Sequence, residues 1–339
     1  MHTPRSSSPS RRALLTAGGA LGLGALVAAC GSGGKTSSEP AGAKGPWSFT
    51  DDRGTTAKSD RTPARVVAFT AAAAALHDFG IECVGVFGPT KLKDGTADPQ
   101  AGDIDIAKVT VLGNVWGEFN VEKYAALAPD LLVTNMYQPG ALWYVPDDSK
   151  KKILSLAPGI AFTVADVSLT EPIRRYAELA ASLGADLKAA KVTDAKARFE
   201  RASETLRRAA KAKGGLKVLA ASGSADLLYV STPGVYADLS YFRSLGVDVI
   251  TPGKVTGGFF ENLSWENADK YPADLILLDD RSSALQPEDL AAKPTWAQLP
   301  AVKAGQVTPW ASEPRFSYAG AAPLIERLAA AVEKAAKVA

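Results

Sequence analysis

Apolar runs of strand length alternate with stretches of helical periodicity downstream of residue 44. Runs of roughly four to eight apolar residues are typical of buried strands, and helical patterns between them indicate parallel βαβ units. The alternation therefore predicts an α/β fold. The predicted strands cover residues 65–69, 83–87, 131–134, 160–164, 217–221, 247–250, 275–278 and 306–308.

The order of these elements occurs twice along the chain. Glu122 is followed eight residues later by Asp130 and an apolar run. Glu266 and Asp274 repeat this arrangement 144 residues further on, again before an apolar run. Such an ordered repeat is the signature of a duplicated structural unit. We therefore predict two similar Rossmann-like lobes with a ligand cleft between them.

One apolar stripe, which includes Val192, Phe199 and Leu206, runs between the two repeats, and no Gly or Pro interrupts residues 187–213. This spacing predicts a continuous helix, which at roughly 1.5 Å per residue is about 39 Å long. A surface helix of one lobe is the alternative to a bridge. We assign residues 47–186 to an N-terminal lobe, 187–213 to a bridging helix and 214–339 to a C-terminal lobe.

The first 29 residues have the pattern of a cleaved export signal. Three arginines, at positions 5, 11 and 12, precede an uncharged apolar stretch over residues 13–29. Residues 27–30 read Val-Ala-Ala-Cys and resemble the bacterial lipobox, which implies that Cys30 is acylated and anchors an extracytoplasmic protein to the membrane. Residues 30–46 would form a flexible tether. A short membrane span or a buried helix is the alternative, and the paired arginines leave the Sec and twin-arginine routes both open.

Composition and charge narrow the class of protein. The chain is 46% hydrophobic and 22% charged, which excludes a disordered chain and a multi-span membrane protein. Removal of the signal leaves 35 basic against 36 acidic side chains, so we expect no nucleic-acid partner. Cys83 would then be the one cysteine besides Cys30, and we interpret it as a small buried side chain in a strand.

Ligands of open parallel sheets bind beyond the carboxyl ends of the strands. Tyr137 and Arg281 follow the third predicted strand of their respective lobes, while Trp116 and Phe260 stand six residues before the two repeated glutamates. We expect these four side chains to face the cleft. Other aromatic and cationic residues that we place in loops complete the candidate set: Tyr229, Trp310, Arg315 and Phe316. A loop aromatic can also cover the core, and Arg315 can simply be solvated.

Catalytic and metal-binding patterns are scarce. The sequence contains no G-x-S-x-G, Walker A or H-E-x-x-H motif, and His77 is the one histidine after the signal. We therefore expect neither a bound metal nor a cofactor, and no enzymatic activity, with a lipid-anchored enzyme as a remote alternative. Glu122 and Glu266 follow the N-cap residues Asn120 and Ser264, where a carboxylate gains about 0.3 to 1 kcal/mol from the helix dipole. That gain does not explain why both lobes carry the same group.

Four sets of residues together resemble a known family, the iron-siderophore (helical-backbone) class of solute-binding proteins that serve ABC importers. The resemblance extends from Pro46 to the end of the chain. Its motifs are Arg-Val-Val at 65–67, Asn-Val-Glu at 120–122 with 127–132, Leu-Ser-Trp-Glu at 263–266 with 273–276, and Trp296 with 299–307. The resemblance implies a monomer in which Glu122 and Glu266 dock onto arginines of a dimeric permease.

The resemblance also bears on the ligand. Many hydroxamate-binding members carry an arginine where Trp116 stands, so that role would pass to Arg281. Ferric triscatecholates are polyanions that favour a basic pocket, whereas ferric trishydroxamates are neutral or cationic and suit aromatic walls. We therefore expect a ferric hydroxamate of the desferrioxamine type, whose iron arrives within the ligand. Cobalamin and haem are the alternatives, and Tyr137 could serve haem as an axial ligand.

Overall fold

The protein is described here by a computed structural model that covers residues 45–92 and 94–339. Cys30, the predicted signal peptide and residues 30–44 of the predicted tether lie outside the described residues. Among the residues that are described, no helix is both long enough and apolar enough to cross a membrane. The first described strand, β1 (Trp47–Thr50), pairs in antiparallel fashion with β2 (Thr56–Ser59).

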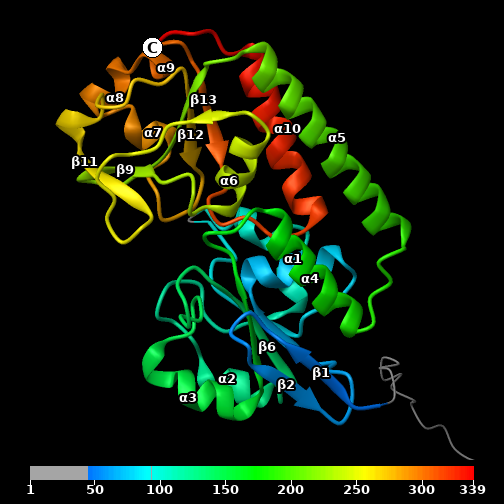
Figure 1. The fold of residues 1–339 in the computed structure, drawn as a ribbon. Coiled ribbons are helices and arrows are strands. Elements are labelled where there is room, and N and C mark those ends of the chain that lie inside the picture. Colours follow the sequence, from blue (N-terminus) through cyan, green and yellow to red (C-terminus); the bar gives the residue numbers. More distant parts are fainter. Residues whose placement is uncertain (1–44, 93) are drawn as a thin grey trace, which may run out of the picture. The chain divides into compact units, whose positions relative to one another are not determined.

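The N-terminal lobe is built on a five-stranded parallel sheet in the order β5-β4-β3-β6-β7 (Figure 1). The central strand is β3, and its register with β6 places Val66 opposite Leu131. Every residue of these two strands is buried, as expected for a parallel sheet covered on both faces. The strands are β3 (Val66–Phe69), β4 (Gly85–Phe87), β5 (Thr110–Val111), β6 (Leu131–Met136) and β7 (Gly159–Thr163).

The C-terminal lobe repeats the centre of this sheet but not its edge. Strands β8, β12 and β13 are parallel, like β3, β6 and β7, and Val218 stands opposite Leu275 as Val66 stands opposite Leu131. On the other side of β8 the antiparallel strands β9 and β11 follow, while β10 is a two-residue parallel strand. The strands are β8 (Lys217–Gly223), β9 (Leu227–Ser231), β10 (Asp248–Val249), β11 (Phe260–Ser264), β12 (Leu275–Asp279) and β13 (Val307–Trp310).

All eight predicted strands are present, and the prediction of two similar α/β lobes is confirmed. Strands β1, β2, β5, β9 and β11 were not predicted. Strands β1, β2, β5 and β11 are short or edge strands without a continuous apolar run. Strand β9 has such a run at residues 227–230, but it lies outside the repeated parallel pattern, because it pairs in antiparallel fashion with β8 and β11. Cys83 is buried just before β4 rather than within it, and burial raises the pKa of its thiol to about 12.

Helices cover both sheets and connect the lobes. The α-helices are α1 (Thr70–Asp78), α2 (Val121–Ala126), α3 (Asp147–Leu156), α4 (Thr170–Ser182), α5 (Ala190–Ala212), α6 (Ala237–Ser244), α7 (Pro287–Leu290), α8 (Pro294–Gln298), α9 (Pro300–Lys303) and α10 (Tyr318–Lys334). The 3₁₀ turns are η1 (Pro99–Ala101), η2 (Ile106–Lys108) and η3 (Trp265–Asn267).

The predicted bridging helix is α5, which runs alongside α10 in Figure 1. At its start, the Lys191 ammonium donates to the backbone carbonyl of His77 in the N-terminal lobe (3.2 Å). Further along, Arg198 forms a two-bonded ion pair with Glu326 of α10 (2.6 and 2.8 Å). The helix therefore joins the lobes while packing mainly on the C-terminal one.

The two lobes share one hydrophobic core. A single cluster of buried side chains extends from Val67 and Phe162 of the N-terminal sheet through Phe199 of α5 to Leu275 of the C-terminal sheet. A second cluster, which includes Leu219 and Trp296, fills the opposite face of the C-terminal sheet. A backbone link adds to this connection, because Ala165 after β7 bridges Tyr236 before α6. The junction between the lobes is therefore packed rather than a loose linker.

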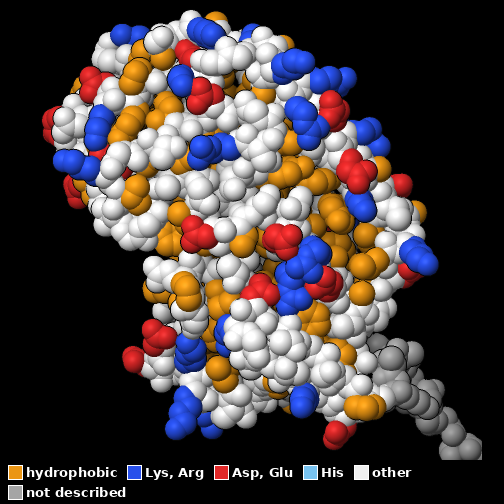
Figure 2. Space-filling model, in the orientation of Figure 1, with side chains coloured by type: hydrophobic (Ala, Val, Ile, Leu, Met, Phe, Trp, Pro, Cys, Tyr) orange, Lys and Arg blue, Asp and Glu red, His pale blue; other side chains and the backbone are white. Residues whose placement is uncertain are grey.

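Charged side chains of both signs are mixed on the face of the molecule drawn in Figure 2. On the face drawn in Figure 2, acidic and basic side chains alternate over most of the area, and groups of both signs gather where the lobes meet. No broad basic area of the kind that nucleic acid requires is visible on that face.

Candidate functional site at the junction of the lobes

A cluster of aromatic rings forms the N-terminal side of the junction. The ring of Trp116 meets Trp143 edge-on at 4.7 Å and Tyr144 at 5.1 Å, and Tyr137 lies 4.6 Å from Trp143. Trp116 is 62% exposed, so one side of this cluster is open to solvent. We call Trp116, Tyr137, Trp143 and Tyr144 the aromatic wall. It offers apolar area together with ring edges and faces on which a ligand can pack.

Tyr144 holds its place in the aromatic wall with an uncommon backbone conformation. Its φ is 59°, in the left-handed region that bulky side chains rarely adopt. The ring of Phe69 at the end of β3 stacks on it at 5.2 Å, and this packing holds the ring in place. Residues in strained conformations gather at binding sites, where the surrounding structure maintains them.

A network of charges forms the C-terminal side. The Arg281 guanidinium donates to both carboxylate oxygens of Asp279 (2.7 to 3.1 Å) and also to Glu313. Ser312 donates a further hydrogen bond to Asp279 (2.9 Å). The indole N–H of Trp143 crosses from the other lobe to Glu313 (3.2 Å). The aromatic wall and the charge network are thus in direct contact.

The ionisable groups of the two sides influence one another. Burial raises the pKa of Tyr137 far above its usual value, and Glu313 raises it further while Arg281 lowers it. The pKa of Tyr144 is raised to about 12, first by burial and then by the same carboxylate. Burial also raises the pKa of Tyr236, from the C-terminal lobe, to about 12. Tyrosines from both lobes therefore surround Arg281 and Glu313, as neutral hydroxyl groups at physiological pH.

Three of the predicted ligand contacts belong to the aromatic wall or the charge network: Trp116, Tyr137 and Arg281. The Tyr137 hydroxyl is buried without a hydrogen-bond partner, so it is available to a ligand group that reaches it. Arg281 differs from expectation, because carboxylates of its own chain already hold its guanidinium. It neutralises Asp279 and Glu313 and leaves few donors free.

Tyr229 and Phe260 lie on strands rather than in loops, which corrects their predicted setting. They occupy the antiparallel strands β9 and β11, with ring centroids 5.0 Å apart, and the Tyr229 hydroxyl is 3.2 Å from Ser224 Oγ. The repeat suggested a loop for Phe260, but β11 has no counterpart in the other lobe. No described contact joins this pair to the aromatic wall.

Trp310 and Phe316 belong to the packed interior. Trp310 lies on β13 with 4% of its surface exposed, and its indole N–H donates to Asp238 (2.6 Å). Phe316 is 2% exposed and stacks on Tyr176. Both side chains are almost fully buried, so they offer little surface for the predicted ligand contact. Burial raises the pKa of Asp238 to about 7, against the hydrogen bond from Trp310.

Arg315 connects the lobes instead of standing free. Its guanidinium lies 3.4 Å from Asp78 and 3.2 Å from Asp103, both in the N-terminal lobe. The side chain passes between Gly102 and Gly320, where a Cβ would come within 2.2 Å of it. These glycines are needed for the close approach. Arg315 thus links the two lobes through ion pairs, and 17% of its side chain remains exposed.

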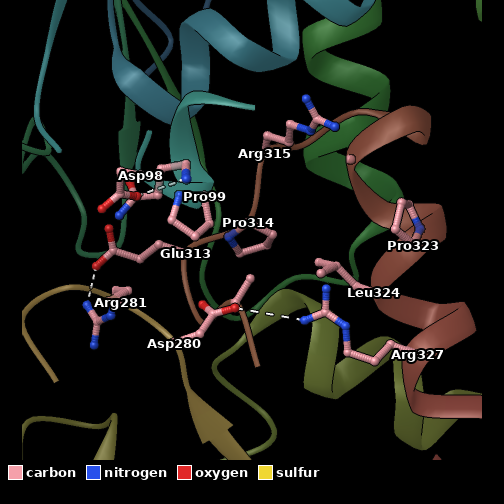
Figure 3. A pocket seen from close by; sticks show the side chains of 13 residues that line it. Asp98, Pro99, Asp280, Arg281, Glu313, Pro314, Arg315, Pro323, Leu324 and Arg327 are labelled. Atoms are coloured by element: carbon pink, nitrogen blue, oxygen red, sulfur yellow. Dashed lines mark hydrogen bonds and ion pairs between the residues drawn. The ribbon is translucent and has the colours of Figure 1, made fainter. Parts of the chain in front are cut away.

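A cavity of about 170 Å³ adjoins the charge network (Figure 3). Its lining comes from both lobes: Asp98, Pro99 and Gln100 on one side, and Asp280, Arg281, Glu313, Arg315 and residues of α10 on the other. This volume is below the roughly 300 to 1,000 Å³ of pockets that enclose a whole ligand. The cavity can therefore take part of a large ligand, with the remainder on the aromatic wall.

The predicted set left out several residues of this site, among them Asp98, Trp143, Tyr144 and Glu313. Trp143 lies in a loop with other aromatics, which is a usable signal. Glu313 carries a weaker one, as an acidic residue two positions before Arg315 in a predicted loop. Asp98 carries none, because its partners across the junction are distant in the sequence. No group of three or more His, Cys, Asp or Glu in the described part of the chain is arranged to hold a metal ion.

Glu122 and Glu266 are both exposed at the starts of short helical segments. Glu122 lies in the first turn of α2, which Asn120 caps by accepting the Lys123 backbone N–H (2.8 Å). Glu266 lies in the 3₁₀ turn η3 rather than an α-helix, and Ser264 provides no such cap. The Glu266 backbone N–H and the Ser264 hydroxyl instead lower the pKa of the Glu266 carboxyl.

Comparison with known proteins places the chain in a family. Residues 84–314 match the family described as periplasmic binding protein. The chain belongs to the periplasmic binding protein family. Its members bind solutes and are not enzymes, which agrees with the lack of catalytic motifs. Among curated proteins, none matches the chain.

Solved structures of other periplasmic binding proteins share the fold. DesE, a ferric-siderophore receptor protein from Streptomyces coelicolor, is 57% identical over 86% of this chain and 100% of its own, with a TM-score of 0.84. The petrobactin-binding protein YclQ from Bacillus subtilis is 18% identical over 86% of this chain and 100% of its own, with a TM-score of 0.65. A siderophore-binding protein from the fuscachelin gene cluster of Thermobifida fusca is 21% identical over 80% and 96%, with a TM-score of 0.56.

Proposed function

We propose that this periplasmic binding protein captures a ferric trishydroxamate siderophore outside the cytoplasm and delivers it to an ABC importer. The observation that carries the proposal is the 57% identity with a ferric-siderophore receptor across that receptor's whole length. The likenesses below 25% identity support the fold alone. The iron would arrive with the ligand, so the protein needs no metal site of its own.

The chemistry of the junction favours a hydroxamate over a catecholate. The aromatic wall presents flat apolar rings, and the cationic Arg281 is already neutralised by Asp279 and Glu313. A ferric triscatecholate carries several negative charges and would meet two buried carboxylates without free cations to balance them. A neutral or cationic ferric hydroxamate avoids this repulsion.

A fluorescence titration tests the ligand class. Ferric desferrioxamine should quench the tryptophan emission saturably, whereas a ferric triscatecholate, haem and cobalamin should not. Trp116→Phe should reduce the amplitude of quenching, because Trp116 forms the exposed edge of the wall. Trp296→Phe is the matched control, since Trp296 is buried in the second core cluster of the C-terminal lobe. Saturable binding of haem or cobalamin in place of the hydroxamate would reassign the ligand.

The remaining parts of the proposal concern delivery and anchoring. The exposed carboxylates of Glu122 and Glu266 would dock onto cationic patches of a permease dimer, with the binding protein acting as a monomer.

Acylation of Cys30 would hold the protein at the membrane. Cys30→Ala should release an exported, folded protein from the membrane fraction. If that variant stays firmly membrane-bound, the lipid anchor is wrong.

A further inference from the structure

The cavity beside the charge network has two buried acceptors without hydrogen-bond partners. They are Asp98 Oδ2 and Gln100 Oε1, on side chains that are 2% and 6% exposed. Both residues line the cavity. The other Asp98 oxygen accepts the Gln100 backbone N–H (2.9 Å), which fixes the carboxyl in place. Buried acceptors are nearly always paired, so this pair points to a donor that arrives with a ligand.

The arginines near the cavity do not supply that donor. Arg281 is held by Asp279 and Glu313, and Arg315 by Asp78 and Asp103. Arg327 lies 3.9 Å from Asp280 at the far side of the cavity.

Three carboxyl groups line this space, those of Asp98, Asp280 and Glu313, and so do three guanidinium groups. Two of these guanidinium groups, those of Arg281 and Arg315, also pair with carboxylates outside the lining: Asp78, Asp103 and Asp279. The proximity of the carboxyl groups affects Asp280 in the cavity wall, because burial and the neighbouring Asp279 raise its pKa to about 6. Burial also raises the pKa of Asp98, although Arg281, the Ser282 hydroxyl and the Gln100 N–H act against it. The cavity thus has unpaired acceptors, while two of its arginines are also engaged by carboxylates outside it, which favours a cation with several N–H donors.

Size and position restrict what that cation can be. About 170 Å³ admits an ammonium group with a short alkyl chain but not a ferric complex. Glu313 lines the cavity and also accepts the Trp143 indole N–H of the aromatic wall. Figure 3 shows Asp98, Glu313 and Asp280 around the same space, from both lobes. A ligand lying on the wall can therefore extend a chain past Glu313 into the cavity.

We propose that the cavity is a subsite for a primary ammonium group at the end of the siderophore, held by Asp98 and Gln100. This inference rests on the proposed function and names the ligand more narrowly, as a linear ferric trishydroxamate with a free terminal amine. The three N–H donors of the ammonium would bond to Asp98 Oδ2, to Gln100 Oε1 and to the Glu313 or Asp280 carboxylate. Neutral or cyclic complexes leave these acceptors unpaired.

The test compares two ligands that differ at the amine. A linear ferrioxamine with a free terminal amine should bind the wild-type protein at least about tenfold more tightly than its N-acetylated form, because acetylation removes the charge and two of the three N–H donors. Asp98→Asn keeps the Oδ1 acceptor for Gln100 and should reduce that preference to roughly threefold or less. Its affinity for the acetylated ligand should stay unchanged. Calorimetry with both ligands gives all four affinities.

A matched control and a second variant make the outcome decisive. Asp103→Asn removes a carboxylate that is 72% exposed and does not line the cavity, so the preference for the amine should persist. Gln100→Leu should weaken the preference as well, and it serves if Asp98→Asn fails to fold. Equal binding of the two ligands by the wild type overturns the subsite and leaves the proposed function standing. Failure of both ligands to bind overturns the proposed function and the subsite with it.

Discussion

The two lobes share a sheet core but contribute opposite chemistry to the junction. The N-terminal lobe supplies the aromatic wall from loops that follow parallel strands, whereas the C-terminal lobe supplies the network of Arg281, Asp279 and Glu313. Tyr137 and Arg281 follow equivalent strands, β6 and β12, yet one is a neutral aromatic side chain and the other is charged. Duplication therefore preserved the position of the site residues, while their chemistry diverged.

Each lobe carries an exposed glutamate at an equivalent position, Glu122 and Glu266. Substitution of these two residues should have the largest effect, and that effect should be on uptake. Glu122→Lys and Glu266→Lys should each lower uptake by the intact transporter about tenfold or more, because a lysine would face a cationic permease patch. The double variant should abolish uptake. Ligand affinity and melting temperature should hardly change, since both side chains are exposed. Uptake assays in cells, with purified protein for binding and melting, measure this.

Glu288→Lys is the control for these variants, because Glu288 is an exposed glutamate of α7 in the C-terminal lobe. Normal uptake by the stable double variant would refute docking and return both glutamates to a local role at helix ends. Loss of uptake in Glu288→Lys would show that any added charge disturbs delivery.

Arg281→Ala tests the charge network of the junction and should lower the free energy of unfolding, unlike changes in the aromatic wall. The change leaves Asp279, whose side chain is fully buried, and Glu313 without their shared cation. Breaking such a buried network costs about 3 to 5 kcal/mol in the free energy of unfolding. Denaturant unfolding at neutral pH measures the loss, and adding Glu313→Gln should recover part of it. A loss below that of Arg174→Ala, an exposed pair on α4, would contradict this assignment.

Trp116→Ala should have the reverse effect, with weaker binding and intact stability. Trp116 is 62% exposed, so its removal takes contact area from the ligand rather than from the core. Affinity for a ferric hydroxamate should fall about tenfold, as for one well-placed aromatic contact. Phe316→Ala is the contrasting variant, because it empties a buried site and should cost about 3 to 5 kcal/mol in stability. Unchanged affinity in Trp116→Ala would remove the exposed ring from the binding surface.

The sequence predicted the parts of the fold that have strong local signals. Continuous apolar runs located β3, β6, β8 and β12, and the stripe of Phe199 and Leu206 located α5. Strands β9 and β11 were not predicted because they pair in antiparallel fashion outside the repeated parallel pattern, and the edge strand β11 is also partly exposed. The duplication itself misled at this point, since it transferred the loop setting of Trp116 to Phe260.

The site was predictable where a residue follows a strand and unpredictable where the other lobe decides its role. Tyr137 and Arg281 were found from the carboxyl ends of β6 and β12. Burial of Phe316 and engagement of Arg315 depend on Tyr176 and Asp78, which are far away in the sequence. The sequence pattern around residues 314–318 is compatible both with contact to a ligand and with an ion pair that links the lobes. Only tertiary packing distinguishes the two.

The smallest effect concerns motion between the lobes. The lobes share one core cluster, α5 contains no Gly or Pro, and Arg315 and Ser317 both bind Asp78 across the junction. These contacts should limit ligand binding to loop adjustments and a slight rotation. Small-angle scattering curves with and without ferric hydroxamate should therefore nearly superimpose. Asp78→Ala removes the acceptor shared by Arg315 and Ser317, and it should enlarge any difference between the two curves. A large fall in the radius of gyration of the wild type on ligand binding would contradict this expectation. It would mean that the ligand-free lobes stand apart and close by bending at the segment after β7.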